Sequence, residues 1–272
     1  MSFVLVRGGG DLASGVALRL HEYGLPVIIS ELPMPVAVHR KGCFADAVYA
    51  GRTQVEDCVA CRVDDPIENS SLVARIIAGG AIPVLVDPVG EAVELFHPKV
   101  VVDGRMLSRH LAPQPHPGQL LIGLGPGFVA GENCDVVVET TCGNPMGSVL
   151  SKGAAQCNTS ESQTTDGRRD ECVLRAPADG RVKTYAHIGD HIATGETIAE
   201  VDGHFVIATF NGILRGLIYP GMMVKKGMKI GDLDPRDDPR LCFHVSDESR
   251  VVAEGVLEAI QSKLDLQELK RQ

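Results

Sequence analysis

A pattern of glycines and apolar residues occurs twice between residues 176 and 233, and the two copies lie 32 positions apart. Glycine favours turns that need a positive φ, and short apolar runs between such turns are typical of β-strands. Neither copy is long enough to bury its own apolar face, so the two are expected to pack together as a small β domain. The clearest matched pairs are Ala176 and Ala208, Gly180 and Gly212, Gly189 and Gly221, Gly195 and Gly227, and Ile198 and Ile230.

The repeated segment resembles the biotinyl and lipoyl carrier domains, through residues 176–180, 189–192, 195–198 and 221–227. The resemblance implies a small carrier-like β sandwich, also described as a barrel-sandwich hybrid. A working carrier presents a lysine at the tip of the hairpin between its two halves, and this lysine takes the cofactor. The hairpin here, residues 200–206, reads Glu-Val-Asp-Gly-His-Phe-Val and has no lysine. We therefore expect the carrier fold without biotin or lipoate.

Length and charge limit the classes of protein to consider. A chain of 272 residues has room for two domains, each with its own core. The net charge of −9 argues against nucleic acid as a partner, because phosphate binding requires a basic face. No apolar run reaches the roughly 18 residues of a membrane span, and the opening residues do not read as a signal peptide. We expect a cytoplasmic protein whose eight cysteines are thiols and which has no membrane partner.

The chain opens with a strand, a glycine turn, a helix and a second strand. Residues 3–6 are apolar, a helix is predicted from Asp11 or Leu12 to Tyr23, and the next strand ends at Glu31. This order is that of the first βαβ unit of a dinucleotide-binding fold. The spacing agrees with the glycine fingerprint, in which alanine is allowed at the third position, and Glu31 lies 21 residues after Gly10. The candidate cofactor-binding residues are Gly8, Gly9, Gly10, Asp11, Ala13, Ser14, Gly15 and Glu31.

Two interpretations of this glycine turn remain open. Small residues let a phosphate approach the backbone amides at the amino end of a helix, and Glu31 could then accept a hydrogen bond from a ribose hydroxyl. Alternatively, the turn only packs the helix on the strand. Asp11 weighs against an anionic ligand, because a carboxylate beside the phosphate site repels it unless a cation intervenes.

Further apolar runs at residues 82–86, 99–102, 120–124 and 135–138 are expected to be strands. They consist almost wholly of Val, Ile and Leu without alternation, which is typical of strands covered on both faces. The predicted fold is therefore a Rossmann-like α/β domain with a mostly parallel sheet. Ligands of such sheets lie beyond the carboxyl ends of the strands, where Glu31, Asp87 and Asp103 should gather.

The loop at residues 123–127 lies at that same edge of the predicted sheet. Gly123, Gly125 and Gly127, stiffened by Pro126, can turn successive amides inward as an anion-binding nest, so the three glycines are further candidate binding residues. A plain strand-terminating turn is the alternative. Cys142 follows a nearby strand and is the candidate catalytic thiol, against the alternative of a small structural residue.

The remaining cysteine and histidine patterns point less clearly to chemistry. Cys58 and Cys61 form a lone CxxC without a second pair at metal-finger spacing, and no metal site is expected there or among the scattered histidines of the repeat. Residues 246–248 can cap a helix that extends to Leu269. This C-terminal helix could return to the first domain or form an oligomer contact. The predicted domains are 1–155, a flexible loop at 156–172, the repeat at 173–236, and a final segment at 237–272.

Four motifs occur in the same order as in one bacterial family: residues 8–15, 44–51, 122–128 and 231–236. On these, the chain is similar over nearly its full length to the YqeB-type accessory proteins of the selenium-dependent molybdenum hydroxylase system. The sequence departs from the family pattern directly after the Glu139-Thr140 pair. The family tends to have Arg-Gly-His there, whereas this chain has Thr-Cys-Gly-Asn at 141–144, which puts a shared anion site in doubt.

The family resemblance implies an accessory or maturation factor for a selenium-dependent molybdenum hydroxylase, which would be its client. The ligand would be a nucleotide, or the nucleotide part of a molybdenum cofactor, and the β domain would dock the client. No catalytic residue can be carried over. Two alternatives stay open: an NAD(P)-dependent oxidoreductase, and a non-catalytic docking scaffold. Neither the identity of the ligand nor the oligomeric state follows from the sequence, and a homo-oligomer is possible.

Overall fold

The computed structural model describes residues 3–107, 118–141, 145–156, 172–265 and residue 269. The chain divides into two compact units. The first consists of Met1–Pro35, Phe44–Ser162 and Val245–Gln272, and the second consists of Val36–Cys43 and Gln163–His244. The short segment Val36–Cys43 thus leaves the first unit and packs with the second before the chain returns.

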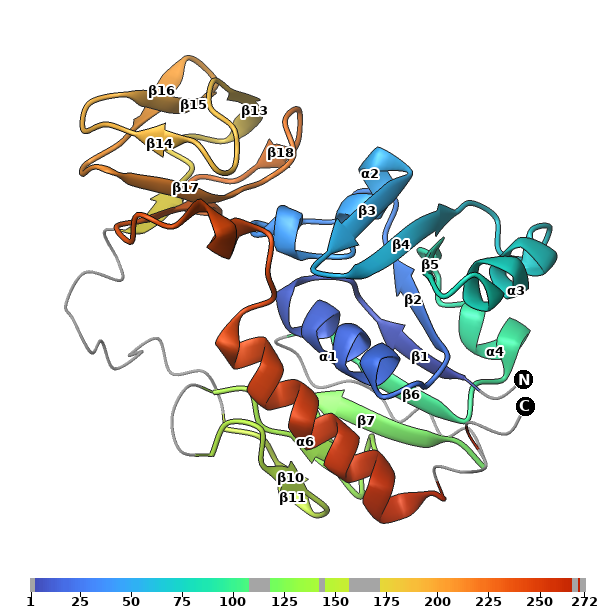
Figure 1. The fold of residues 1–272 in the computed structure, drawn as a ribbon. Coiled ribbons are helices and arrows are strands. Elements are labelled where there is room, and N and C mark those ends of the chain that lie inside the picture. The colour runs from blue at the N-terminus through green and yellow to red at the C-terminus, as the bar shows by residue number, and fades with distance from the viewer. Residues whose placement is uncertain (1–2, 108–117, 142–144, 157–171, 266–268, 270–272) are drawn as a thin grey trace. The chain divides into compact units, whose positions relative to one another are not determined.

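The first unit is built on a nine-stranded sheet with the order β10-β9-β7-β6-β1-β2-β5-β4-β3 (Figure 1). All neighbouring strands from β9 to β4 run parallel, while β10 and β3 add antiparallel edges. Two further short strands, β8 (Val129–Ala130) and β11 (Gly153–Ala154), pair with each other. The nine strands are β1 (Val4–Arg7), β2 (Val27–Glu31), β3 (Arg52–Val55), β4 (Cys58–Val63), β5 (Ile82–Val86), β6 (Val100–Asp103), β7 (Leu120–Leu124), β9 (Val136–Val138) and β10 (Val149–Leu150).

Helices cover both faces of this sheet, which is why its central strands are apolar throughout. Val4 and Val6 of β1 point into one core, and Leu5 of the same strand points into the other. The first core is closed by α1 (Asp11–Glu22), α2 (Asp46–Ala50) and α6 (Asp247–Lys263). The second is closed by α3 (Ser70–Ala78) and α4 (Ala92–Phe96).

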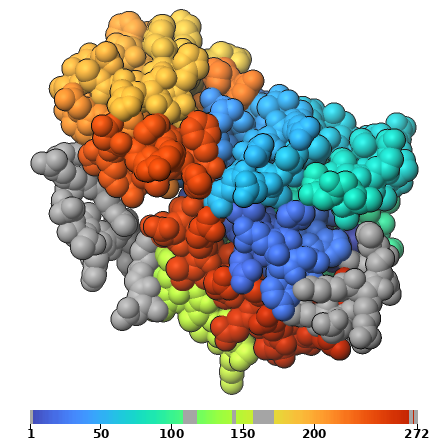
Figure 2. Space-filling model, viewed as in Figure 1, coloured from blue at the N-terminus to red at the C-terminus, as the bar shows by residue number. Residues whose placement is uncertain are grey.

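The helices α1 and α6 lie side by side although more than 200 residues separate them in the chain (Figures 1 and 2). Gly15 of α1 permits this, because a Cβ at that position would lie 2.5 Å from the Cβ of Ser249 in α6. The Oγ of Ser246 accepts a hydrogen bond from the amide of Ser249 and caps α6, as residues 246–248 predict. The helix ends at Lys263, earlier than expected from the sequence.

The predicted Rossmann-like fold class is wrong for this unit, whose sheet is parallel-rich but mixed. The first βαβ unit forms, since β1, α1 and β2 follow one another and β1 pairs with β2 in parallel. Six central strands, β5-β2-β1-β6-β7-β9, keep the 3-2-1-4-5-6 order of dinucleotide-binding domains, but β4 adds a strand outside β5 although it precedes β5 in the chain. The hairpin of β3 and β4 then reverses the sheet direction at its edge. The apolar runs identify strands but do not fix their order.

The second unit contains two separate four-stranded sheets, β12-β19-β17-β14 and β16-β15-β13-β18, and every pairing in them is antiparallel. Strands recur at the spacing seen in the sequence, so that β13, β14 and β15 are followed by β17, β18 and β19 about 32 residues later. The strands are β12 (Val173–Arg175), β13 (Gly180–Thr184), β14 (His191–Ile192), β15 (Thr197–Val201), β16 (His204–Ile207), β17 (Gly212–Leu217), β18 (Met223–Val224) and β19 (Lys229–Asp234).

The expectation of a biotinyl or lipoyl carrier sandwich is not supported and is corrected to a pair of antiparallel sheets. Any repeated antiparallel unit needs glycine at its turns and apolar residues between them, so the 32-residue pattern is not specific to carriers. This unit also packs elements from outside the repeat against β17. They are the short 3-10 helices η1 (Arg40–Gly42) and η2 (Pro239–Cys242).

Among the residues that the structure describes, no helix is long and apolar enough to cross a membrane. The boundaries expected from the sequence for the individual domains stay a prediction.

Candidate functional site

The candidate site lies at the edge of the nine-stranded sheet where the parallel strands end. The register places Arg7 of β1 beside Asp103 of β6, and Asp103 beside Gly123 of β7. The next strand pair places Leu124 beside Val138, and Glu31 at the end of β2 pairs with Val86. The glycine turn, Glu31, Asp103 and the 123–127 loop therefore follow neighbouring strands along one edge.

Two glycines of the first turn are fixed by packing and by backbone hydrogen bonds. Gly8 has a φ of +95°, and a Cβ on it would lie 3.2 Å from the carbonyl oxygen of Gly104. A Cβ on Gly9 would lie 3.0 Å from the amide nitrogen of Ala45, which donates to the Gly9 carbonyl at 2.9 Å. The Ser14 hydroxyl also donates to that carbonyl. These glycines are needed for the turn itself, whatever it binds.

Gly10 differs from its neighbours because it faces open space. Apart from its two chain neighbours, no described residue has an atom within 4 Å of the position that a Cβ on Gly10 would take, and the φ of −73° at Gly10 suits any residue. It is the N-cap of α1, and no side chain caps the helix there. The amino end of a 12-residue helix, with its positive dipole and its first-turn amides, thus opens where an anion could approach.

Glu31 is used by the protein itself. Its Oε2 accepts from the Gly9 amide at 2.7 Å, and its Oε1 accepts from the Leu32 amide at 2.6 Å. Burial raises the pKa of Glu31, and these two amide hydrogen bonds oppose that rise. The carboxylate therefore ties the end of β2 to the glycine turn. Each oxygen keeps a second lone pair, so a ribose hydroxyl could still donate to it.

Asp11 and Gly15 face α6. The Ser249 hydroxyl lies 3.0 Å from Asp11 Oδ1, so the carboxylate that weighs against an anionic ligand is engaged by a neighbouring helix. Gly15 is buried against Ser249. Ala13 is also buried, and its Cβ would lie 3.0 Å from a Cβ placed on Gly104. These three candidate residues hold α1 in position rather than facing the open space at Gly10.

Asp87 and Asp103 lie at the same edge, as expected from the sequence, together with two arginines that the sequence analysis did not single out, Arg7 and Arg105. Asp103 is almost fully buried and accepts from Arg7 at 3.4 Å and from Arg105 at 2.6 Å. Burial is the main cause of a lowered pKa at Arg7. Asp87 accepts from the amides of Gly90, Glu91 and Ala92 and so caps the start of α4. Arg7, like Asp103, is the last residue of a buried strand, and this position is the sequence feature that could have identified it as a candidate.

The 123–127 loop is packed more tightly than an open anion nest would be. A Cβ on Gly123 would lie 2.1 Å from the ring of Phe128, and a Cβ on Gly125 would lie 2.3 Å from Thr140 Oγ1. Gly127 has a φ of +97°, and its carbonyl accepts from the side-chain Nδ2 of Asn133 at 3.0 Å. The loop thus packs against its surroundings at two of its three glycines.

The neighbouring Glu139 is buried, and its carboxylate accepts from the amides of Thr140, Thr141 and Gln156. Three amide donors satisfy this buried charge and tie the end of β9 to residues 17 positions later. Cys142, the candidate catalytic thiol, lies outside the described residues. Its expected role stays a prediction.

Two buried thiols, Cys58 and Cys134, are poorly suited to reaction. Burial raises the pKa of Cys58 to about 12 and that of Cys134 to about 11, so both stay protonated near neutral pH. Cys58 lies in β4 directly opposite Val55, as part of a structural hairpin. Among the described residues, no group of three or more His, Cys, Asp or Glu side chains could hold a metal ion.

Solved structures with detectable likeness to the chain are distant. A succinylglutamate desuccinylase/aspartoacylase from Rhodobacter sphaeroides is 22% identical over 26% of this chain and 24% of its own, with a TM-score of 0.23. An aspartoacylase family protein from Mesorhizobium loti is 10% identical over 85% and 84%, with a TM-score of 0.26. The ectoine utilization protein EutE (DoeB) from Ruegeria pomeroyi is 13% identical over 85% and 86%, with a TM-score of 0.25. At such scores the likeness carries no argument about fold or activity.

No model of a known protein family matches the chain. The chain is 38% identical over 257 residues to the uncharacterized protein YqeB of Escherichia coli (strain K12). The alignment covers 94% of this chain but 47% of YqeB, so the chain spans about half the length of that curated relative. An identity of this size over most of the chain supports a YqeB-like family, as the motifs at residues 8–15, 44–51, 122–128 and 231–236 indicate.

Proposed function

We propose that this chain is an accessory protein that binds a nucleotide, or the nucleotide part of a molybdenum cofactor, at the amino end of α1. The observation that supports this most is the open space at Gly10, between residues that are otherwise closely packed. A phosphate there would meet the free end of a helix, and Glu31 would lie beside it at the end of β2. The role in maturing a selenium-dependent molybdenum hydroxylase rests on the family resemblance alone.

The residues at the site fit the nucleotide portion of such a cofactor. The helix terminus suits a phosphate group, and the engagement of Asp11 by Ser249 reduces the charge conflict at the helix start. Glu31 can accept hydrogen bonds from hydroxyl groups. These residues would bind and orient the ligand, while any redox chemistry would belong to the cofactor.

The test is a thermal-shift panel of the purified chain against NAD, NADP, ATP, CTP, CDP and the nucleotide form of the molybdenum cofactor. A ligand at about a hundred times its dissociation constant adds about 2.7 kcal/mol to the free energy of unfolding, which raises the melting temperature visibly. Stabilisation by cytidine nucleotides or by the cofactor would support the proposal. Stabilisation by NAD or NADP alone would favour a nicotinamide-dependent oxidoreductase instead, and no shift with any ligand would favour a docking scaffold.

Gly10→Asn makes the test specific to the site. Asparagine is a good N-cap residue, and its side chain would enter space that the protein leaves open, so the fold should be kept or slightly stabilised. The variant should nevertheless lose the nucleotide-induced shift. If Gly10→Asn kept the full shift, the ligand would bind elsewhere and the proposed site would be wrong.

A further inference from the structure

The outer face of one sheet in the second unit exposes a patch of large apolar side chains, defined here as Tyr185, Phe205 and Ile207. Their exposed fractions are 54%, 58% and 49%. Phe205 and Ile207 alternate along β16, and the rings of Tyr185 and Phe205 lie 6.5 Å apart between centroids. On the opposite face of the same strands, Val182, Val201 and Val206 are buried. The patch is therefore not part of the core of this unit.

The charges within the patch are balanced. Glu200 pairs with Phe205 across the sheet, and its carboxylate accepts from Lys183 at 3.0 Å and from the Tyr185 hydroxyl at 2.5 Å. A partner that covers the patch would contact the Glu200 carboxylate, whose negative charge is already balanced by Lys183. Lys183 itself lies on the same face, so the centre of the patch has no net charge.

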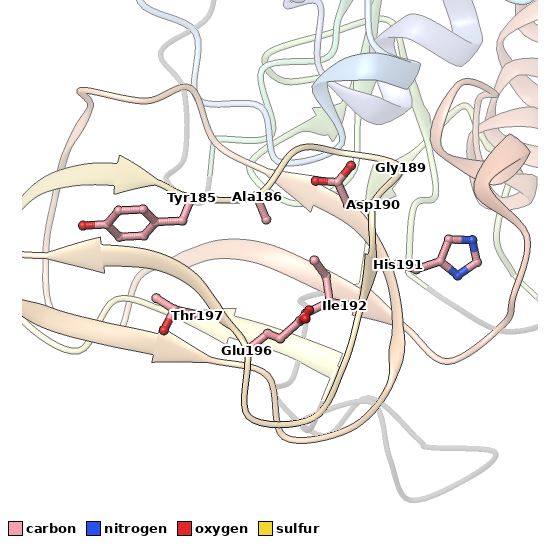
Figure 3. Close-up of a pocket in the computed structure, with 8 residues that line it drawn as sticks. All are labelled: Tyr185, Ala186, Gly189, Asp190, His191, Ile192, Glu196 and Thr197. Carbon is pink, nitrogen blue, oxygen red and sulfur yellow. The ribbon is translucent and has the colours of Figure 1, made fainter.

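A cavity of about 610 Å³ continues from the patch, because Tyr185 and Thr197 line it and Thr197 pairs with Ile207 (Figure 3). The remaining lining residues are Ala186, Gly189, Asp190, His191, Ile192 and Glu196. Two of them carry negative charge, and the lining includes no lysine or arginine. Figure 3 shows the Glu196 side chain beside Ile192, with Ala186 and Asp190 across the space from it.

Each carboxylate in the cavity uses only one oxygen in the protein. Asp190 Oδ2 accepts from the His187 amide at 2.7 Å, and Glu196 Oε2 accepts from the Ala193 amide at 2.8 Å. These bonds fix both side chains in tight turns, so they are held in place at little further entropic cost. Their second oxygens have no hydrogen bond to any described residue and can accept from a ligand.

We propose that this face docks a protein segment that presents apolar side chains next to a lysine or arginine. The apolar side chains would cover Tyr185, Phe205 and Ile207, and the cation would enter the cavity between Asp190 and Glu196. Charge complementarity selects this partner over an acidic one. The proposal does not depend on nucleotide binding in the first unit.

The experiment uses the full chain and three fluorescein-labelled synthetic peptides of equal length, followed by fluorescence anisotropy. One peptide combines Leu and Phe with Lys, the second replaces Lys by Glu, and the third keeps Lys but replaces Leu and Phe by Ser. The first should bind at least about tenfold more tightly than either of the others. Equal binding of the glutamate peptide would overturn the proposal.

Two variants assign the binding to this face. Phe205→Ser removes apolar contact and leaves every charge, so a tenfold or greater loss of affinity could not come from general attraction to an acidic protein. The double variant Asp190→Asn/Glu196→Gln removes both negative charges from the cavity but keeps a side-chain oxygen to accept from each turn amide. Its affinity for the lysine peptide should be about tenfold lower than that of the wild-type chain. Matched controls in the first unit are Val89→Ser, at a side chain that is 74% exposed, and Glu258→Gln. Both should leave affinity unchanged.

Sedimentation velocity tests whether a second copy of the chain, and not another protein, covers the patch. If the wild-type chain formed dimers that Phe205→Ser dissolved, the occupant of the patch would be a second copy and the proposal would be wrong. The far-UV circular dichroism spectrum of Phe205→Ser should match that of the wild-type chain, which shows that the second unit is folded, and any nucleotide-induced thermal shift in the first unit should be kept. Failure of peptide binding with an intact nucleotide shift would overturn this inference without touching the proposed function.

Discussion

Glycine serves two different purposes in this chain, and one pair of glycines from each unit illustrates them. In the first unit, Gly15 and Gly123 stand where another side chain approaches, 2.5 Å and 2.1 Å from the position of a Cβ. In the second unit, Gly195 and Gly227 have φ values of +89° and +82°, and nothing lies within 4 Å of a Cβ on either. The first pair needs glycine for space and the second pair needs it for backbone conformation. The repeat contains both uses, because a Cβ on Gly212, the match of Gly180, would lie 2.5 Å from the carbonyl oxygen of Asp234.

The units also differ in charge. The second has 12 acidic and 13 basic residues, so the first carries the whole of the chain's excess negative charge. The first unit nevertheless buries carboxylates at its candidate site, each satisfied by amides or arginines. The proposed sites differ accordingly: the proposed ligand site lies at a polar edge of the first unit, and the proposed partner site lies at an apolar face of the second.

The largest expected effect comes from filling the contact between α1 and α6. Gly15→Ala would place a methyl group against Ser249 and its backbone, so one helix must shift. We expect a loss of about 3 kcal/mol in the free energy of unfolding, measured by urea denaturation. Gly10→Ala, in open space within the same segment, should cost about 1 kcal/mol or less. Similar losses in both variants would show that space is not what Gly15 provides.

The repeat predicts a matched pair of smaller effects. Gly195→Ala and Gly227→Ala occupy equivalent turns with positive φ and open surroundings, so each should cost about 1–2 kcal/mol through backbone strain alone. Asparagine, which tolerates this conformation better, should recover part of the loss at both positions. Urea denaturation of the four variants measures this. A large difference in unfolding free energy between the two alanine variants would show that the two copies of the repeat are not equivalent.

The pH dependence of stability should change when Glu31 is replaced. The pKa of Glu31 is raised by burial in the folded chain, so its contribution is most favourable below its unfolded pKa and is lost as pH rises through the folded value. Relative to Glu31→Gln, the wild-type chain should therefore lose stability between acidic and neutral pH. We expect this pH-dependent loss of stability to be smaller than the losses in the glycine variants. Urea denaturation at several pH values measures it. A parallel pH dependence of the two proteins would contradict the raised pKa.

The smallest effect is expected at the ion pair between Arg19 and Glu254, which also joins α1 to α6. The two side chains approach to 2.6 Å, but both are substantially exposed to solvent. A double-mutant cycle with alanine at each position should give a coupling of about 0.5 kcal/mol. A coupling comparable to the Gly15→Ala loss would mean that charge, and not close packing, holds these helices together.

Parts of this fold could be predicted from sequence because their signals are local. The glycine turn between residues 3–6 and α1, the cap at Ser246 and the 32-residue repeat all follow from patterns within a few residues. The strand order could not be predicted, since the insertion of β5 between β2 and β4 depends on packing across the sheet.

The candidate site likewise contains some residues that the sequence predicts and others that only the structure reveals. Gly8, Gly10 and Glu31 were found from the fingerprint, but the pairing of Arg7 with Asp103 joins two strands that are 96 residues apart in the sequence. Gly15 fits the same motif, and only the position of Ser249 shows that it serves helix packing. A motif identifies a turn, whereas the contacts around it determine what each residue in the turn does.

The most direct test of the central claim is amide hydrogen exchange of the wild-type chain with and without the best-stabilising nucleotide. If the ligand binds at the amino end of α1, the peptide that contains residues 8–13 should gain the strongest protection, and Gly10→Asn should abolish it. Protection centred on another segment, or unchanged in Gly10→Asn, would contradict the assignment of the nucleotide site to this turn.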